Sequence, residues 1–194
     1  MADFTLYFRL GISHISDLQG YDHILFIVAL CAAFSFSEWK KVLILVTAFT
    51  IGHSLTLALA TLNYLLVPGE IIEFLIPVTI LLTALSNVIR RETDAAGKSV
   101  WIQYGFALFF GLIHGMGFSN YLRQLMGMED SIFVPLLAFN LGLELGQIVI
   151  VGVFALISAV VLSLMKYPHR EWKIFVSGAA AGISLILMSQ TKFW

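Results

Sequence analysis

The chain passes from polar to apolar sequence at Gly20-Tyr21-Asp22-His23-Ile24-Leu25-Phe26. Asp22 and His23 stand side by side there, at the start of an apolar run that continues to Phe36. The run is typical of a membrane helix. An ionisable group that enters hydrocarbon costs roughly 2.5–3.5 kcal/mol on insertion scales, so this pair indicates a functional role.

The composition predicts an integral membrane protein. The 194 residues are 59% hydrophobic and 12% charged, and their mean hydropathy is +0.92. Soluble domains carry about 25% charged residues, so a soluble globular fold is excluded. The net charge of -1 comes without a basic stripe, which argues against nucleic acid as a partner. The partner that the composition requires is the lipid bilayer.

Apolar runs predict an all-α, polytopic membrane helix bundle, with residues 1–194 forming a single transmembrane domain. The runs cover residues 22–36, 42–62, 71–89, 100–118, 132–165 and 174–188. A helix needs ~20 residues to cross a bilayer, so about six spans are expected. The run over 132–165 predicts either one tilted helix or a half-helix plus a span, which would give seven spans. Residues 1–18 are more polar and predict an interfacial helix or a short re-entrant segment.

The basic residues are distributed unevenly between the two ends of such a bundle. Three fall on the side of the N-terminus, namely Arg9, Arg123 and Lys192. Eight fall on the other side: Lys40, Lys41, Arg90, Arg91, Lys98, Lys166, Arg170 and Lys173. Cytoplasmic loops carry the excess of basic residues, so we expect the N-terminus outside a bacterial-type inner (plasma) membrane.

The ionisable groups that are costly to bury in a membrane lie at one depth in this topology. A helix rises ~1.5 Å per residue, which puts His53 and His114 about 20 Å above the cytoplasmic edge. Glu144 descends roughly 18 Å from the opposite edge. Asp22 and His23 begin at the outer edge itself. The sequence therefore predicts that these groups meet in the outer half of the membrane.

The residue types at this depth predict a site for a divalent transition metal. Imidazole together with carboxylate suits nickel, cobalt or zinc. The candidate ligands are His14, Asp22, His23, His53, His114 and Glu144. A buried carboxylate is protonated unless a cation lies beside it, which gives Glu144 a physical reason to face the histidines.

Smaller polar residues accompany these ligands on the same helices. They are Thr50 and Ser54 next to His53, and Asn140 and Gln147 on the helical face of Glu144. Asn140, Glu144 and Gln147 fall at i, i+4 and i+7, and so form one polar stripe. We expect these four residues to orient the ligands by hydrogen bonds. Helix packing explains the hydroxyl groups about equally well.

Two pairs of glycines form small-xxx-small faces in the predicted helices. These are Gly111 with Gly115, and Gly142 with Gly146. Such faces let a neighbouring helix approach closely. They are also the faces through which a homo-oligomer is expected, if the protein forms one.

Four segments resemble the signature segments of the HupE/UreJ membrane family, in its second branch. They are Asp22-His23-Ile24-Leu25-Phe26, residues 49–57 (FTIGHSLTL), residues 111–118 (GLIHGMGF) and residues 139–147 (FNLGLELGQ). The resemblance covers about residues 10–155. It implies a role in the uptake of nickel or cobalt.

Two functions are consistent with these residues. The first is a permease for a divalent transition metal, whose ion binds the six candidate ligands in the outer half of the membrane. The alternative is a membrane-embedded, zinc-type hydrolase that faces the outer side, with Asp22 or Glu144 as the base. The sequence leaves open whether the protein is an enzyme. A polar path to the cytoplasm favours the permease, and a lateral opening to lipid favours the hydrolase.

Overall fold

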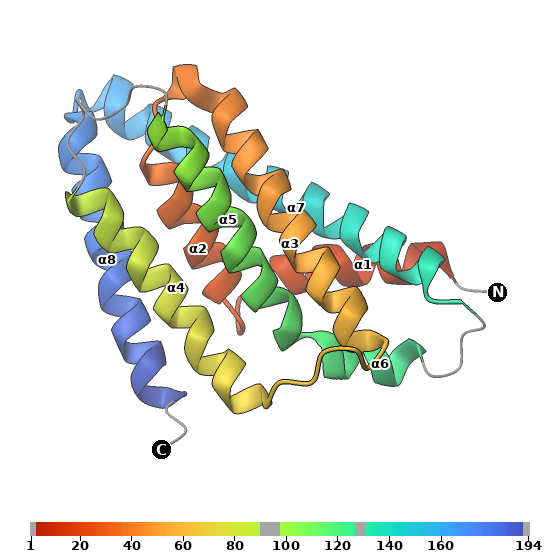
Figure 1. Cartoon of the computed structure of the whole chain (residues 1–194). Coiled ribbons are helices and arrows are strands. Elements are labelled where there is room, and N and C mark those ends of the chain that lie inside the picture. Colours follow the sequence, from red (N-terminus) through yellow and green to blue (C-terminus); the bar gives the residue numbers. More distant parts are fainter. Residues whose placement is uncertain (1–2, 90–97, 127–130, 192–194) are drawn as a thin grey trace.

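The protein is a bundle of helices (Figure 1), seen in a computed structural model that describes residues 3–89, 98–126 and 131–191. Its α-helices are α1 (Phe4–Ile15), α2 (Asp22–Ala32), α3 (Trp39–Thr61), α4 (Gly69–Ile89), α5 (Lys98–Gly117), α6 (Ser119–Met126), α7 (Phe133–Ala159) and α8 (His169–Gln190). A 3-10 turn (Phe36–Glu38) leads into α3, and a π-helical segment (Val160–Leu164) continues α7. The prediction of an all-helical bundle is confirmed.

Among the residues that the structure describes, four helices are long and apolar enough to cross a membrane. They are α3 with its 3-10 turn, α4, α7 with its π-helical end, and α8. Helix α2 is apolar over only 11 residues, about half of a span. Helix α5 coincides with the apolar run over residues 100–118. Residues 133–164 form one continuous helical segment of 32 residues, so the half-helix with a separate span, and with it the seventh span, is wrong.

Neighbouring helices alternate in direction along the chain (Figure 1). Helices α2, α4 and α7 end at the same side of the bundle at which α3, α5 and α8 begin. We call this side the basic end, because the topology predicted from the sequence has eight basic residues there. The alternation agrees with the predicted topology, and the orientation of the bundle in a membrane stays a prediction. The charged loop over residues 90–97 lies outside the described residues.

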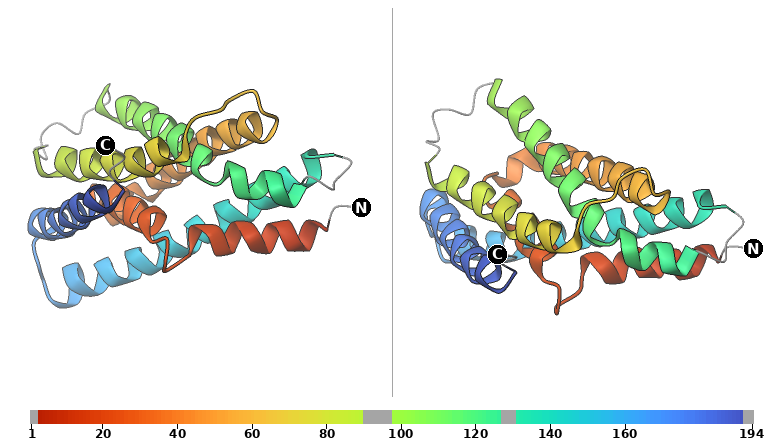
Figure 2. Two further views of the ribbon diagram at one scale, coloured as in Figure 1. Left: turned by 90° about the horizontal axis from the view of Figure 1, so that it is seen from below. Right: turned by 60° about the horizontal axis from the view of Figure 1, so that its bottom comes forward.

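The N-terminal helix α1 packs along the first half of α7, and both helices run in the same direction (Figure 2). The side chain of Asp3 caps α1 by accepting hydrogen bonds from the backbone nitrogens of Thr5 and Leu6, at 2.9 and 3.2 Å. Gly11 lies directly against the backbone of α7, and Gly142 lies directly against the backbone of α1. This contact fixes the end of α1 inside the bundle.

Helices α3 and α5 also cross at glycines. A side chain at Gly52 would meet the carbonyl of Leu108, and one at Gly111 would meet the carbonyl of Phe49. Gly115 lies equally close to the carbonyl of His53. Both predicted glycine faces are therefore filled by helices of the same chain, α3 against Gly111 and Gly115, and α1 against Gly142 and Gly146. These faces are therefore not free to form a homo-oligomer, contrary to the expectation.

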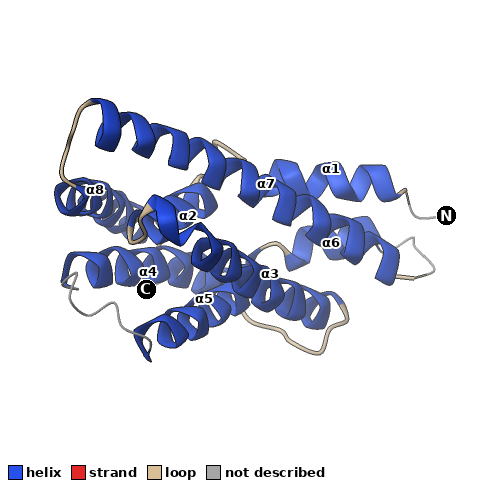
Figure 3. Ribbon diagram, turned by 90° about the horizontal axis from the view of Figure 1, so that it is seen from above, coloured by secondary structure: helices blue, strands red, loops and turns tan. Residues whose placement is uncertain are grey.

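Local signals explain where the helices near the site begin and end. Ser35 and Glu38 form a capping box at the start of the 3-10 turn. Helix α3 ends at Thr61, and two residues later Asn63 has a φ of 62°, the left-handed conformation that commonly follows the end of a helix. Helix α6 was not expected, because its sequence is polar. It follows α5 after one residue and lies beside the end of α3 in Figure 3.

Candidate metal centre

Four histidines from four different helices meet inside the bundle. His14 lies in the last turn of α1, and His23 lies in the first turn of α2. His53 is in the second half of α3, and His114 is in the last turn of α5. His53 and His114 are completely buried, and His23 is 5% exposed. The predicted convergence of the histidines thus takes place.

Three of these imidazoles are close enough to share one metal ion. The ligand atoms of His14, His23 and His53 lie within 4.8 Å of one another. The ring centroid of His14 is 4.7 Å from that of His23 and 5.9 Å from that of His53. Nitrogens bound at 2.0–2.1 Å to one tetrahedral ion lie roughly 3.4 Å apart, so small side-chain rotations would close the site.

Asp22 holds the His23 ring in one orientation. The His23 Nδ1 atom lies 3.1 Å from Asp22 Oδ1, which also accepts the backbone N–H of His23 at 2.9 Å. An ionised carboxylate can only accept, so Nδ1 carries the proton and the lone pair is on Nε2. Nε2 is buried without a hydrogen-bond partner. A carboxylate behind a histidine in this way is the usual arrangement around metal-binding imidazoles.

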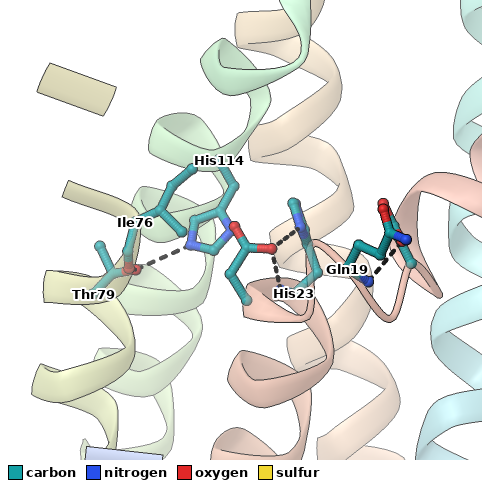
Figure 4. A network of polar contacts seen from close by, with 7 residues as sticks. Gln19, His23, Ile76, Thr79 and His114 are labelled. Carbon is teal, nitrogen blue, oxygen red and sulfur yellow. Dashed lines mark hydrogen bonds and ion pairs between the residues drawn. The ribbon is translucent and has the colours of Figure 1, made fainter. Parts of the chain in front are cut away.

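Thr79 of α4 fixes the tautomer of His114 (Figure 4). The Thr79 hydroxyl donates its only proton to the carbonyl of Ile76 at 2.7 Å. It must therefore accept from His114 Nε2, which lies 3.0 Å away. The lone pair of His114 is then on Nδ1, which is buried and has no partner. The His114 ring centroid is 5.0 Å from that of His23, so this fourth imidazole borders the triad.

The remaining two imidazoles also have unused nitrogens. His14 Nε2 and both ring nitrogens of His53 are buried without a hydrogen-bond partner. Buried polar atoms are normally paired, so this cluster needs a ligand to satisfy it. Burial, followed by the neighbouring His23, lowers the pKa of His14 well below its usual value, whereas Asp22 acts in the opposite direction. His14 is therefore neutral at physiological pH, in the form that binds metal ions.

Phenylalanine rings enclose the cluster. Phe118 lies 4.1 Å and Phe139 5.7 Å from the ring centroid of His14. Phe26 and Phe49 lie 5.3 and 5.1 Å from that of His114. Apolar walls of this kind lower the local dielectric constant and strengthen the interaction between a cation and its ligands.

The structure places Glu144 outside this group. Its Oε1 atom accepts a hydrogen bond from the Thr47 hydroxyl at 2.7 Å. Thr47 is six residues from His53 on α3, about 9 Å of helical rise. The carboxylate thus belongs to the contact between α3 and α7. Glu144 is therefore not part of the histidine triad.

Of the predicted orienting residues, Thr50 and Gln147 serve this helix contact, and Ser54 and Asn140 bond within their own helices. Thr50 donates to Gln147 Oε1 at 2.7 Å, which joins α3 to α7. Ser54 donates to the carbonyl of Thr50 at 2.6 Å, and Asn140 donates to the carbonyl of Leu136 at 2.8 Å. None of these four has a hydrogen bond to a histidine among the described residues. The partner of a histidine that sequence reasoning missed is Thr79, and the recurrence of Thr79, Thr83 and Asn87 at four-residue intervals was the signal that could have found it.

These observations define a class of protein. It is a polytopic integral membrane protein in which a buried cluster of imidazoles forms a candidate metal site. The chain belongs to the HupE/UreJ family, because the family model described as HupE / UreJ protein matches residues 1–194. This family is associated with nickel and cobalt uptake. Neither the curated proteins nor the solved structures gave a match.

Proposed function

We propose that the protein is a permease for a divalent transition metal of the nickel and cobalt type. The observation that carries the proposal is the triad of His14, His23 and His53, whose ligand atoms lie within 4.8 Å of one another. A hydrated dication cannot cross hydrocarbon, so ligands that replace its water inside the bundle are what a permease needs.

Each residue of the cluster has a distinct role in this proposal. His14, His23 and His53 bind the ion through their free nitrogens, and His114 receives it as a neighbouring fourth ligand. Asp22 orients His23 and, with a side chain 25% exposed, gives the outer rim of the site a negative charge that attracts cations. A site made of imidazoles suits nickel and cobalt as well as zinc, so family membership is what favours the first two.

The zinc-type hydrolase receives less support. A metal-dependent hydrolase needs a general base within hydrogen-bond reach of the metal-bound water. Asp22 is hydrogen-bonded to His23, and Glu144 is hydrogen-bonded to Thr47. One oxygen of each expected base is therefore already engaged, in orienting His23 or in the contact between α3 and α7.

Uptake by proteoliposomes tests the proposal. Purified protein is reconstituted, and the entry of radioactive nickel and cobalt is followed over time. We expect saturable uptake that the substitution His53→Ala abolishes. The control is His169→Ala, which removes a histidine outside the cluster and should leave uptake unchanged. Absence of nickel and cobalt uptake by the unaltered protein would overturn the proposal. Hydrolysis of lipid amides or esters by the same protein would establish the alternative.

A further inference from the structure

A row of polar side chains runs along α4 away from the histidine cluster. Thr79, Thr83, Ser86 and Asn87 fall at i, i+4, i+7 and i+8, so they share one helical face. The row begins at His114, whose Nε2 atom lies 3.0 Å from the Thr79 hydroxyl. Thr83 donates to the carbonyl of Thr79 at 2.9 Å, and Ser86 donates to the carbonyl of Thr83 at 2.8 Å. Their protons are thus directed along the helix, and their oxygen lone pairs stay available.

This row leads into a cavity at the basic end of the bundle. The cavity has a volume of about 390 Å³ and lies between α2, α3, α4 and α5. Most of its lining is apolar, and its polar residues are Thr83, Ser86 and Asn87 from α4 and Gln103 from α5. A divalent ion with six waters occupies roughly 180 Å³, at ~30 Å³ per water, so a hydrated ion fits in this space.

Three phenylalanines separate the cavity from the histidines. Phe110 lines the cavity, and its ring centroid is 6.1 Å from that of Phe26. Phe26 and Phe49 lie 4.9 Å apart, and both contact His114. All three side chains are buried. The cluster is therefore closed toward the cavity by aromatic rings, and the polar row on α4 passes beside them.

We propose that the polar row of α4 and this cavity form the route by which the metal ion leaves the histidine cluster. The inference rests on the proposed function and adds the direction of release, toward the basic end. The ion moves from His114 to the oxygens of Thr79 and Thr83 when the His114 ring turns its lone pair toward α4 and the phenylalanine rings rotate, and it regains water in the cavity. Hydroxyl and amide oxygens bind nickel and cobalt more weakly than imidazoles do, which favours release.

Removal of single hydroxyl groups tests the route. Thr83→Val keeps the shape of the side chain, and Ser86→Ala removes a second hydroxyl. Asn87 is left unchanged, because its amide holds α4 to Ala29 and Ser177 at 2.6 and 3.2 Å. The matched control is Ser184→Ala, which removes a buried hydroxyl of α8 that donates to Ala180.

Metal content and uptake rate are measured on the same preparations. We expect both α4 variants to keep the metal content of the unaltered protein and to transport about tenfold more slowly. Ser184→Ala should match the unaltered protein in both measurements. Retained metal content also shows that each variant is folded.

Thiol labelling distinguishes an aqueous route from a cavity filled by lipid chains. Cys31 is replaced by alanine, and a cysteine is placed at Thr83 or, as the control, at Ser184. A charged thiol reagent needs a thiolate, which forms in water and not in hydrocarbon. We expect the cysteine at position 83 to react from the basic end and to block uptake, and the cysteine at position 184 not to react.

The outcomes separate this inference from the proposed function. If the unaltered protein neither binds nor transports the metal, the proposed function fails. If it does both, while Thr83→Val transports at the normal rate and the cysteine at position 83 does not react, only the release route is overturned.

Discussion

Asp22 is the residue whose role in the cluster is most specific. Its carboxylate accepts from His23 Nδ1 at 3.1 Å, which leaves the lone pair on the buried Nε2 atom. We expect Asp22→Asn to weaken metal binding by about 10–100-fold, because an amide orients the imidazole less strongly than a carboxylate does. Equilibrium dialysis of the purified variant against nickel measures the effect. Unchanged affinity would show that Asp22 does not orient the site.

For Glu144 we expect that a substitution leaves metal binding unchanged. Its carboxylate is hydrogen-bonded to Thr47 and is not part of the histidine triad. The variant Glu144→Gln should therefore keep its full metal content, measured by elemental analysis of the purified protein. Loss of the metal in this variant would return Glu144 to the set of ligands.

These two residues show what could be predicted of the site from the sequence. Depth along each helix predicted that the histidines would meet, because the rise per residue is constant. Depth does not determine how a helix is rotated about its axis, so it did not indicate that Glu144 bonds to Thr47. Thr79 was missed because a threonine can satisfy its hydroxyl within its own helix.

At the scale of the helices, the contact between α1 and α7 determines where His14 lies. Gly142 has no room for a side chain, because the backbone of Phe8 lies against it. Gly152, two to three turns further along α7, has open space around it. We expect Gly142→Val to destabilise the protein by about 1–3 kcal/mol through overpacking.

The same substitution should also weaken metal binding, because it displaces α1 and with it His14. Thermal unfolding in detergent and a metal titration measure the two effects. Gly152→Val is the matched control and should resemble the unaltered protein. Equal behaviour of the two variants would mean that α1 is not held by this contact.

The helices themselves were largely predictable. Long apolar runs locate α3, α4, α7 and α8 within a few residues, because a helix that crosses lipid must satisfy its own backbone. The segments that were not foreseen are short. Helix α6 has a polar sequence, and the docking of α1 depends on Gly11 and Gly142, which lie far apart in the chain. Sequence periodicity does not report which distant surfaces pair.

At the scale of the whole molecule, the two ends of the bundle have different roles. The Asp22–His23 pair lies at the start of α2, away from the basic end at which this short helix ends, and the cavity behind Phe110 lies at the basic end. The positive-inside rule makes the basic end cytoplasmic, which would make the protein an importer.

Single cysteines in a Cys31→Ala background test this orientation. Tyr64 is 79% exposed between α3 and α4, and Lys166 is exposed between α7 and α8, at the opposite end. We expect Tyr64→Cys to react with an impermeant reagent on intact cells, and Lys166→Cys to react only after the cells are opened. The reverse pattern would invert the topology.

Metal content of the purified protein tests the central claim most directly. Nickel and cobalt are quantified in the unaltered protein, in His23→Ala and in His169→Ala, after loading and desalting. We predict about one ion per chain in the unaltered protein and in His169→Ala, and almost none in His23→Ala, which loses a ligand of the triad. An unaltered protein without bound metal, or a His23→Ala variant that keeps its metal, would contradict the existence of this site.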